Sequence, residues 1–330
     1  MLEIVHPGLL CTVQDAGRIG FQHLGVGPAG PMDWVSARLA NLAVGNVLGA
    51  PVLEFNGFVG SFRLSNDALV CRVGGDLEVE GRRVPSCRPV AVKADTVVRL
   101  HPDPGGFRSY VAVAGGLAAP RILGSASAST VALLETFEAR GLAKGTTIAL
   151  GQPSDWALRW QAAWLKQIDP YPRWFVCPPV GGAGGGATTV RVVRDRRGHC
   201  DDASWRQFMA SAFRISMQSN RMGFRLEGPT LSPGRPDVIS HGVVTGTVQL
   251  PPGGQPIILM ADRQTTGGYP VLGHVASVDL PRLAACSPGS TVTFREISVE
   301  TAQSKLLRVH EALEKQRHSV LATRPQDSRY

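Results

Sequence analysis

The stretch TVQDAGRIGFQHLG, from Thr12 to Gly25, is echoed about two hundred residues later by SMQSNRMGFRLEG, from Ser216 to Gly228. With one gap at Gly17, both read hydroxyl, apolar, Gln, then Arg, apolar, Gly, Phe, and finally Gly. Similarity between distant parts of one chain indicates an internal repeat, and a repeat decides how the whole chain is organised. Further echoes in the same order would therefore indicate a duplicated domain.

Two more blocks recur in that order. GGLAAPRILG (Gly115–Gly124) is echoed by GGYPVLG (Gly267–Gly273), and KGTTIAL (Lys144–Leu150) is echoed by PGSTVTF (Pro288–Phe294). Three echoes in register favour an internal duplication in which the first copy carries extra sequence.

Short stretches with alternating apolar residues lie between the blocks, as in TVVRLH (96–101), SYVAVAG (109–115) and STVTFREI (290–297). Such alternation is typical of β-strands, and the 38 glycines and 24 prolines indicate many tight turns. Short strands of this kind favour closed barrels, which leave no exposed sheet edges. The sequence predicts a mainly β chain of two tandem barrels with a few short helices.

Four segments have helical patterns. The first begins with Asp33 as N-cap and ends near Gly45, and the second begins at Ser154. The second helix carries Trp156, Trp160 and Trp164 on one face, which fits a helix that covers a barrel end or, less well, a partner-docking surface. The other two are DDASWRQFMASAF (201–213) and the amphipathic SVETAQSKLLRVHEAL (298–313).

The glycine-rich run PPVGGAGGGATT (178–189) separates the two halves. It lacks the terminal Gly-Lys-Ser/Thr of a phosphate-binding loop and precedes a strand, so a flexible linker is favoured. The predicted division is a first lobe at 1–153, a helix and linker at 154–187, a second lobe at 188–300, and a C-terminal helix with a polar tail at 301–330.

The composition excludes several classes of function. The net charge of +8 arises largely from basic runs at 191–197 and after residue 302, and neither run interleaves aromatic residues as nucleic-acid platforms do. The six scattered cysteines have no metal-ligand spacing, and no apolar stretch reaches the roughly 18 residues of a membrane span. We expect a cytoplasmic protein with reduced thiols and no metal, nucleic-acid or membrane binding.

No Ser-His-Asp or Cys-His arrangement is evident, and GSASAST (124–130) predicts a turn rather than a nucleophile. Arginine beside glycine at a turn exposes a guanidinium to carboxylate or phosphate, while Gln and Thr donors suit an oxyanion. Intramolecular pairs Asp15–Arg18 and Arg225–Glu227 that hold turns are the alternative. The candidate catalytic residues are Asp15, Arg18, Arg221 and Gln264, and the candidate substrate-binding residues are Gln14, Gln22, His23, Ser219, Arg225, Thr265 and Tyr269. We expect Arg18 and Arg221 to line one composite site.

The stretches TVQDAGRIGFQHLGV, GPMDWVSARLANLAVGN, SNRMGFRLEGP and ADRQTTGGYP together resemble the biotin-dependent carboxyltransferase-like family, over residues 3–302. This family includes allophanate hydrolase subunit 2, the carboxyltransferase half of urea carboxylase, the 5-oxoprolinase subunit designated C and the antagonist of the sporulation kinase inhibitor. The resemblance implies two tandem cyclophilin-like β-barrels. It also implies a paralogous cyclophilin-like partner, of the type of allophanate hydrolase subunit 1 or of the 5-oxoprolinase subunit designated B. A third subunit of lactam-hydrolase type is a further option.

The resemblance implies an ATP-dependent opening of 5-oxo-L-proline to L-glutamate, with ATP bound in the complex. Two alternatives stay open: transfer of CO2 from carboxybiotin to urea or a related amide, and a non-catalytic regulatory protein that binds the kinase-inhibitor-like subunit. Biotin is not expected on this chain, which has no Met-Lys biotinylation motif. The stretches at 125–147 and 190–205 depart from the family's pattern, which keeps the regulatory alternative open.

Overall fold

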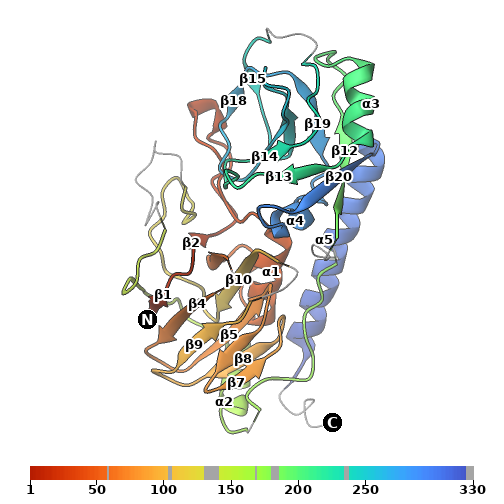
Figure 1. The fold of residues 1–330 in the computed structure, drawn as a ribbon. Coiled ribbons are helices and arrows are strands. Elements are labelled where there is room, and N and C mark those ends of the chain that lie inside the picture. The colour runs from red at the N-terminus through yellow and green to blue at the C-terminus, as the bar shows by residue number, and fades with distance from the viewer. Residues whose placement is uncertain are drawn as a thin grey trace. The chain divides into compact units, whose positions relative to one another are not determined.

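The computed structural model describes residues 1–57, 59–102, 106–129, 141–167, 169–179, 186–233 and 238–324. The chain forms two compact units (Figure 1): unit 1 contains Met1–Gly17, Asp33–Pro179 and His310–Tyr330, and unit 2 contains Arg18–Met32 and Val180–Val309. The mainly β architecture predicted from the sequence is confirmed. The predicted lobe boundaries remain predictions, and residues 180–185 of the glycine-rich run lie outside the described residues.

Unit 1 is built from two antiparallel sheets. The six-stranded sheet has the order β11-β1-β4-β9-β6-β7, and the five-stranded sheet has the order β2-β3-β10-β5-β8. Their strands are β1 (Leu2–His6), β2 (Leu10–Gln14), β3 (Val52–Asn56), β4 (Gly60–Leu64), β5 (Ala68–Val73), β6 (Leu77–Val79), β7 (Arg82–Val84), β8 (Pro89–Val92), β9 (Val97–Leu100), β10 (Arg108–Val113) and β11 (Thr147–Ile148).

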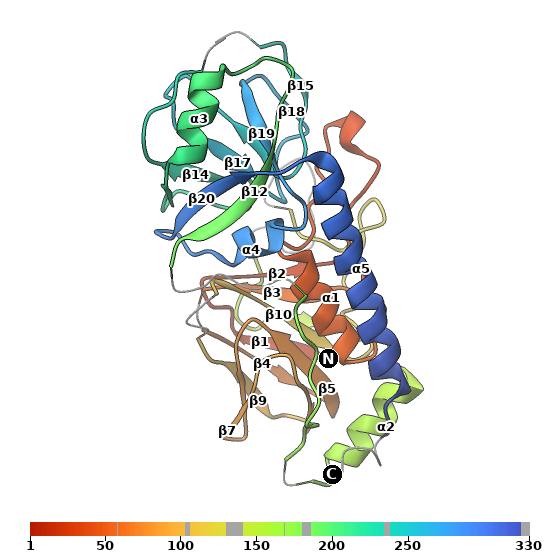
Figure 2. The same ribbon diagram turned by 90° about the vertical axis from the view of Figure 1, so that its right-hand side faces the viewer.

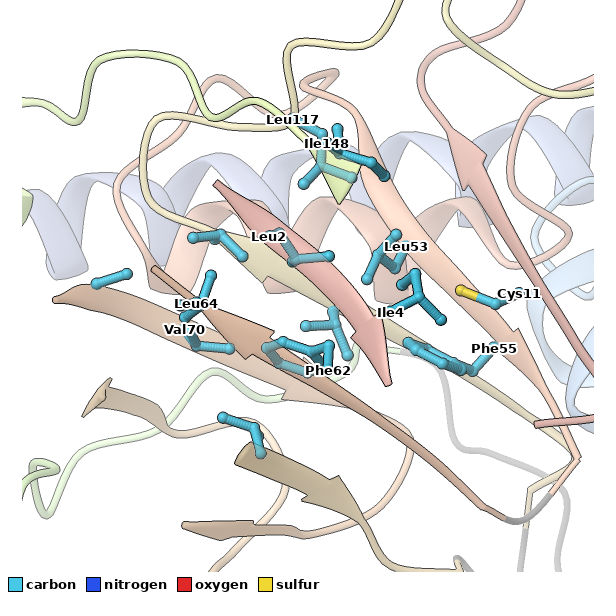
Figure 3. Close-up of a cluster of buried hydrophobic side chains, with 14 of the residues drawn as sticks. Leu2, Ile4, Cys11, Leu53, Phe55, Phe62, Leu64, Val70, Leu117 and Ile148 are labelled. Atoms are coloured by element: carbon cyan, nitrogen blue, oxygen red, sulfur yellow. The ribbon is translucent and has the colours of Figure 1, made fainter. Parts of the chain in front are cut away.

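Both sheets contribute to one core in unit 1 (Figure 3). In β1 the buried residues are Leu2 and Ile4, two positions apart, because successive side chains of a strand point to opposite faces. They lie in one apolar cluster with Phe62 of the same sheet and with Phe55 and Val70 of the other sheet. The core of unit 1 therefore lies between the two sheets. Strand β2 of the five-stranded sheet ends at Gln14.

Two helices pack on the five-stranded sheet of unit 1. Helix α1 (Trp34–Ala43) begins at the predicted N-cap Asp33, whose carboxylate accepts hydrogen bonds from the Val35 and Ser36 amides, and it contacts β3, β5 and β10. Helix α2 (Asp155–Trp164) begins at the predicted N-cap Ser154 and contacts β5 and β8. The predicted tryptophan face of α2 is buried, but the helix packs on strands β5 and β8 of a sheet rather than over the end of a barrel.

Unit 2 contains a closed barrel of seven strands, in the order β12-β19-β16-β17-β14-β13-β20. Figure 2 shows β12 beside β20, the parallel pair that closes the barrel. A separate two-stranded sheet pairs β15 with β18. The strands are β12 (Thr188–Arg194), β13 (Phe213–Ile215), β14 (Gly223–Glu227), β15 (His241–Gly242), β16 (Thr247–Gln249), β17 (Ile257–Leu259), β18 (Thr266–Gly267), β19 (Val271–Val275) and β20 (Thr291–Glu296).

The remaining helices begin at polar caps or follow the strands of unit 2. Helix α3 (Asp202–Ala210) begins at Asp201 as N-cap, and the short α4 (Leu280–Ala285) was not predicted from the sequence. Helix α5 (Val299–Ala322) extends nine residues past the predicted end at residue 313. None of the helices in the described part of the chain has the length and apolar character needed to cross a membrane.

Candidate functional site

Asp15, at the end of β2 in unit 1, is surrounded by hydrogen-bond donors. Its carboxylate accepts hydrogen bonds from the Ser125 and Ser127 hydroxyls, from the Ala126 amide at 2.7 Å and from the Gly17 amide at 2.9 Å. The guanidinium of the half-exposed Arg121 lies 3.1 Å away. Apart from Gly17, these donors come from a segment more than a hundred residues away in the sequence.

The hydrogen bonds around Asp15 determine its charge. Burial alone would raise the pKa of this carboxyl group, but hydrogen bonds from Ser125, Ala126 and Ser127 outweigh burial and lower the pKa below its usual value. A carboxylate held by so many donors is suited to fixing the serine-rich turn in place rather than to accepting a proton. Of the predicted turn at 124–130, the structure has a turn at Leu123–Gly124, closed by a bridge between Ile122 and Ser125. Residues 126–129 have no regular secondary structure, and Thr130 lies outside the described residues.

Gln14 precedes Asp15 and is completely buried. Its Nε2 donates to the Thr12 hydroxyl at 3.0 Å and to the Ala128 carbonyl at 3.2 Å, so it also binds the serine-rich segment. Its Oε1 accepts no hydrogen bond within the described structure. Because the donors of its amide are engaged within unit 1, Gln14 is better placed to fix Ala128 than to donate to an oxyanion.

Arg221 in unit 2 forms a buried ion pair with Asp262. Nε lies 3.0 Å from Oδ2 and Nη2 lies 3.0 Å from Oδ1, while Nη2 also donates to the Gly30 carbonyl at 2.7 Å. Arg221 is 3% exposed and Asp262 is 1% exposed. The charge of this guanidinium is therefore neutralised inside the protein.

Arg18 belongs to unit 2 together with Arg221, and it is also buried. Its backbone amide donates to the Pro28 carbonyl at 2.7 Å, two residues before the Gly30 carbonyl that Arg221 binds. The structure thus brings both arginines to the segment 28–30. A shared role in substrate binding remains a prediction.

Arg263 lies in the stretch ADRQTTGGYP but was not among the candidate catalytic or substrate-binding residues, and in the structure it is a buried cation of unit 2. Its Nη1 donates to the Gln264 carbonyl at 3.1 Å and its Nη2 donates to Oε1 of Gln22 at 2.9 Å. No ion pair within the described ranges involves Arg263, although its side chain is buried, and burial lowers its pKa. The sequence places Asp262 next to Arg263, but it does not show that Asp262 pairs with Arg221, which is 41 residues away.

Gln249 on β16 is a second residue that the sequence did not single out. It is 1% exposed, its Oε1 lies 3.4 Å from Nε2 of Gln264, and its Nε2 has no partner among the residues described. A Cβ at Gly267 would lie 2.4 Å from that Nε2, so any larger residue at 267 would displace the Gln249 amide. The predicted Thr265 is half-buried beside this group, and its carbonyl accepts from the Val243 amide.

The other candidates lie at the surface of unit 2. His23 and Arg225 are exposed, and Tyr269 is 44% exposed. The Ser219 hydroxyl accepts a hydrogen bond from the Arg225 amide at 3.0 Å, which stabilises the turn before β14.

Two of the ion pairs in the structure involve other partners than the pairs Asp15–Arg18 and Arg225–Glu227 considered from the sequence. Glu227 pairs with Arg214 and Asp15 pairs with Arg121. Within the part of the chain that the structure describes, no three His, Cys, Asp or Glu side chains are grouped to hold a metal ion.

Comparisons with known proteins agree with this fold. Residues 24–296 match the family model described as carboxyltransferase domain, subdomain A and B. The chain is similar to the 5-oxoprolinase subunit designated C of Escherichia coli (strain K12), at 34% identity over 92% of this chain and 93% of the relative. It is 26% identical to urea amidolyase of Saccharomyces cerevisiae, covering 92% of this chain but 17% of that protein.

A solved structure gives the same result for the fold. The crystal structure of the Kluyveromyces lactis urea amidolyase superimposes with a TM-score of 0.82 over 99% of this chain, at 23% identity. This chain spans 20% of that much longer protein. The mainly β architecture is therefore shared with a domain of a larger enzyme.

Proposed function

Since this chain belongs to the family of carboxyltransferase domains with subdomains A and B, we propose that it is a subunit of a heteromeric, ATP-dependent amidohydrolase of the 5-oxoprolinase type. The observation that carries the proposal is the 34% identity to the Escherichia coli 5-oxoprolinase subunit along 93% of that relative's length. Similarity over nearly the whole of both chains supports the same role for this chain within a complex of several subunits. The substrate is then 5-oxo-L-proline and the product is L-glutamate.

A paralogous subunit completes the enzyme in this proposal, with a third subunit of lactam-hydrolase type as a further component. The relative is itself one subunit of 5-oxoprolinase, which supports a complex of several chains. We place the complex in the cytoplasm, because the six free cysteines of this chain suit a reducing compartment.

The residues around Arg263 are the best candidates in this chain to bind the substrate. A buried guanidinium without an acidic partner favours a small anion, and the neighbouring Gln264 and Thr265 can donate to an amide or its oxyanion. Arg221 and Arg18 then act as supports, since Arg221 is already neutralised by Asp262. Asp15 holds the serine-rich turn of unit 1 in place.

Arg263 does not by itself suit a nucleotide triphosphate. A triphosphate is bound by several cations and by a row of backbone amides, as at a helix N-terminus. One buried guanidinium fits the single charge of a carboxylate better. Arg263 therefore gives no reason to place ATP on this chain.

A carboxyltransferase is the second candidate function. The similarity to urea amidolyase of Saccharomyces cerevisiae, over 92% of this chain, favours it. In that case CO2 passes from carboxybiotin, carried on another chain, to urea or a related amide. Urea itself has no carboxylate, but carboxybiotin and the carboxylated product each carry one, so the buried charge of Arg263 is compatible with this function as well.

A non-catalytic protein that binds its paralogue remains the third alternative. One reconstitution separates the three. The chain is assembled with its paralogous subunit and the lactam-hydrolase subunit, and L-glutamate formation and ATP hydrolysis are measured with 5-oxo-L-proline. We expect turnover that requires all components. Turnover of urea with carboxybiotin would favour the second function, and a stable complex that turns over neither substrate would favour the third.

A further inference from the structure

Two of the buried arginines of unit 2, Arg221 and Arg263, differ in the charge beside them. Arg221 and Arg263 are each 3% exposed. Asp262 neutralises Arg221, whereas Arg263 has no ion-pair partner among the described residues. Burying a charge without a counter-charge is costly, and it is usually retained where an anion binds.

The two guanidinium groups use the same edge differently. In Arg221 the Nε–Nη2 edge binds both carboxylate oxygens of Asp262 at 3.0 Å. In Arg263 that edge holds one neutral oxygen, Oε1 of Gln22, on Nη2 at 2.9 Å, and its buried Nε has no partner in the described structure. The same edge that binds a carboxylate in Arg221 therefore binds only an uncharged oxygen in Arg263, through one of its two nitrogen atoms.

Gln22 lies on an exposed turn. It begins the short helix η1 (Gln22–Leu24), which has no buried residue, and Ile19 and Leu24 on either side are 76% and 64% exposed. The backbone hydrogen bonds of Leu24, Gly25 and Val26 run to Phe21 and Gln22 and so stay within the turn. Few contacts therefore oppose a movement of Gln22 away from Arg263.

Both ends of this segment are fixed to unit 2. The Arg18 amide binds the Pro28 carbonyl, Arg221 binds the Gly30 carbonyl, and Met32 is part of the apolar core of unit 2. The turn can open while its ends stay in place. A carboxylate brings a full negative charge and two oxygens that can pair with Nε and Nη2 together, so it competes well with the single neutral oxygen of Gln22.

We propose that the Nε–Nη2 edge of Arg263 is a carboxylate-binding subsite, that Gln22 occupies it in the free protein, and that the substrate's carboxylate displaces Gln22. This inference rests on the proposed function, in which the carboxylate is that of 5-oxo-L-proline. The lactam carbonyl then lies within reach of Gln264 and Thr265, the two hydrogen-bond donors that follow Arg263 in the sequence. No covalent step is involved, because the subsite binds and orients the substrate.

Substitutions of the exposed Gln22 test the subsite without disturbing the core. Gln22→Glu places a carboxylate of the same shape on Arg263, so it should raise the KM for 5-oxo-L-proline by about 10- to 100-fold with little change in kcat. Gln22→Ala removes the competing amide and should lower this KM. Gln218→Glu, an equal charge change on another exposed turn of unit 2, is the matched control.

A second variant tests the arginine itself. Arg263→Gln should raise the KM for 5-oxo-L-proline, whereas Arg214→Gln removes an exposed arginine of the same unit and should not. Calorimetry with 2-pyrrolidinone, the same lactam without a carboxylate, should show equal binding to wild type and Gln22→Glu. The inference is overturned if Gln22→Glu leaves the KM within twofold of wild type, or if Gln22→Ala raises it as much.

The two proposals fail in different ways. If the assembled wild-type complex forms L-glutamate but Gln22→Glu has no effect, the subsite is wrong and the function stands. If no L-glutamate forms, the function is wrong, and calorimetry with 5-oxo-L-proline decides the subsite. Binding that Gln22→Glu weakens at least tenfold would retain the subsite, and absence of binding to the wild type would overturn it.

Discussion

Arg221 and Asp262 form a two-pronged ion pair inside unit 2, with Nε–Oδ2 and Nη2–Oδ1 distances of 3.0 Å and side chains that are 3% and 0% exposed. Two charges removed from water are stable together only because each satisfies the other. The pair joins the turn before β14 to the segment after β17, and through the Gly30 carbonyl it also holds the segment 28–30. It supports the region around Arg263.

Asp262→Asn should therefore be strongly destabilising. It leaves a buried guanidinium without its counter-charge, which costs about 3–5 kcal/mol in the free energy of unfolding. Urea denaturation followed by fluorescence measures the loss. Glu227→Gln removes the acid of an exposed ion pair with Arg214 and should leave the transition midpoint unchanged. A loss in Asp262→Asn below about 1 kcal/mol would contradict the structural role assigned to the pair.

Asp15→Asn should destabilise unit 1 and change its response to acid. The pKa of Asp15 lies below its unfolded value, so the carboxylate contributes stability above about pH 4, and that stability is lost as the pH falls through the lower, folded pKa. The asparagine should cost about 1–3 kcal/mol at pH 7. It should also make the free energy of unfolding less dependent on pH below pH 4. A variant as acid-sensitive as wild type would show that other carboxylates dominate.

The local signals in the sequence predicted much of the fold. The N-caps Asp33 and Ser154 begin helices where expected, since a capping side chain within three residues of the amides it binds is a local feature. The third echo is also local: Gly145 and Gly289 both have positive φ and both lead into strands, β11 and β20. A pattern of a few residues predicts structure reliably where the contacts that stabilise it also join residues close together in the sequence.

The first repeated block, Thr12–Gly25 and Ser216–Gly228, was less informative, because its two similar sequences form different structures. Gly223 and Phe224 begin strand β14 and Phe224 is buried, whereas Gly20 and Phe21 lie on the turn before η1 and Phe21 is only half-buried. The second copy makes a strand of the closed barrel, and the first copy does not. Packing against distant residues, which the motif does not encode, decides the outcome.

The candidate site depended on contacts that no local pattern contains. Asp15 was predicted to be catalytic, but its partners Ser125 and Ser127 are about 110 residues away, so its hydrogen bonds could not be predicted. Arg263 looked like one more polar residue beside Gln264. Only the three-dimensional arrangement, in which Asp262 is taken by Arg221, makes Arg263 a buried cation without an acid among the described residues.

The tryptophan cluster of unit 1 should be essential for stability. Trp160 is 1% exposed and its ring lies 4.4 Å from that of Trp164 and 6.2 Å from that of Trp174. Trp160→Ala removes these contacts and leaves a cavity, which should cost about 3–5 kcal/mol in the free energy of unfolding. Leu158→Ala on the same helix changes a side chain that is 45% exposed and should cost much less. Equal midpoints in chemical denaturation would argue against α2 as a covering helix.

His274 on β19 should make unit 2 sensitive to mild acid. Burial lowers its pKa, and Arg197 and His241 lower it further, against the opposing charge of Asp195. Because the unfolded chain binds the proton more readily, the free energy of unfolding should fall as the pH drops below about 6.5, the unfolded value. His274→Gln keeps a polar partner for the Thr247 hydroxyl, now 3.2 Å from Nδ1, and should flatten this dependence between about pH 7 and 5. His23→Gln, at an exposed position, should keep the wild-type slope. If both variants match the wild type over this range, His274 does not carry the acid sensitivity of unit 2.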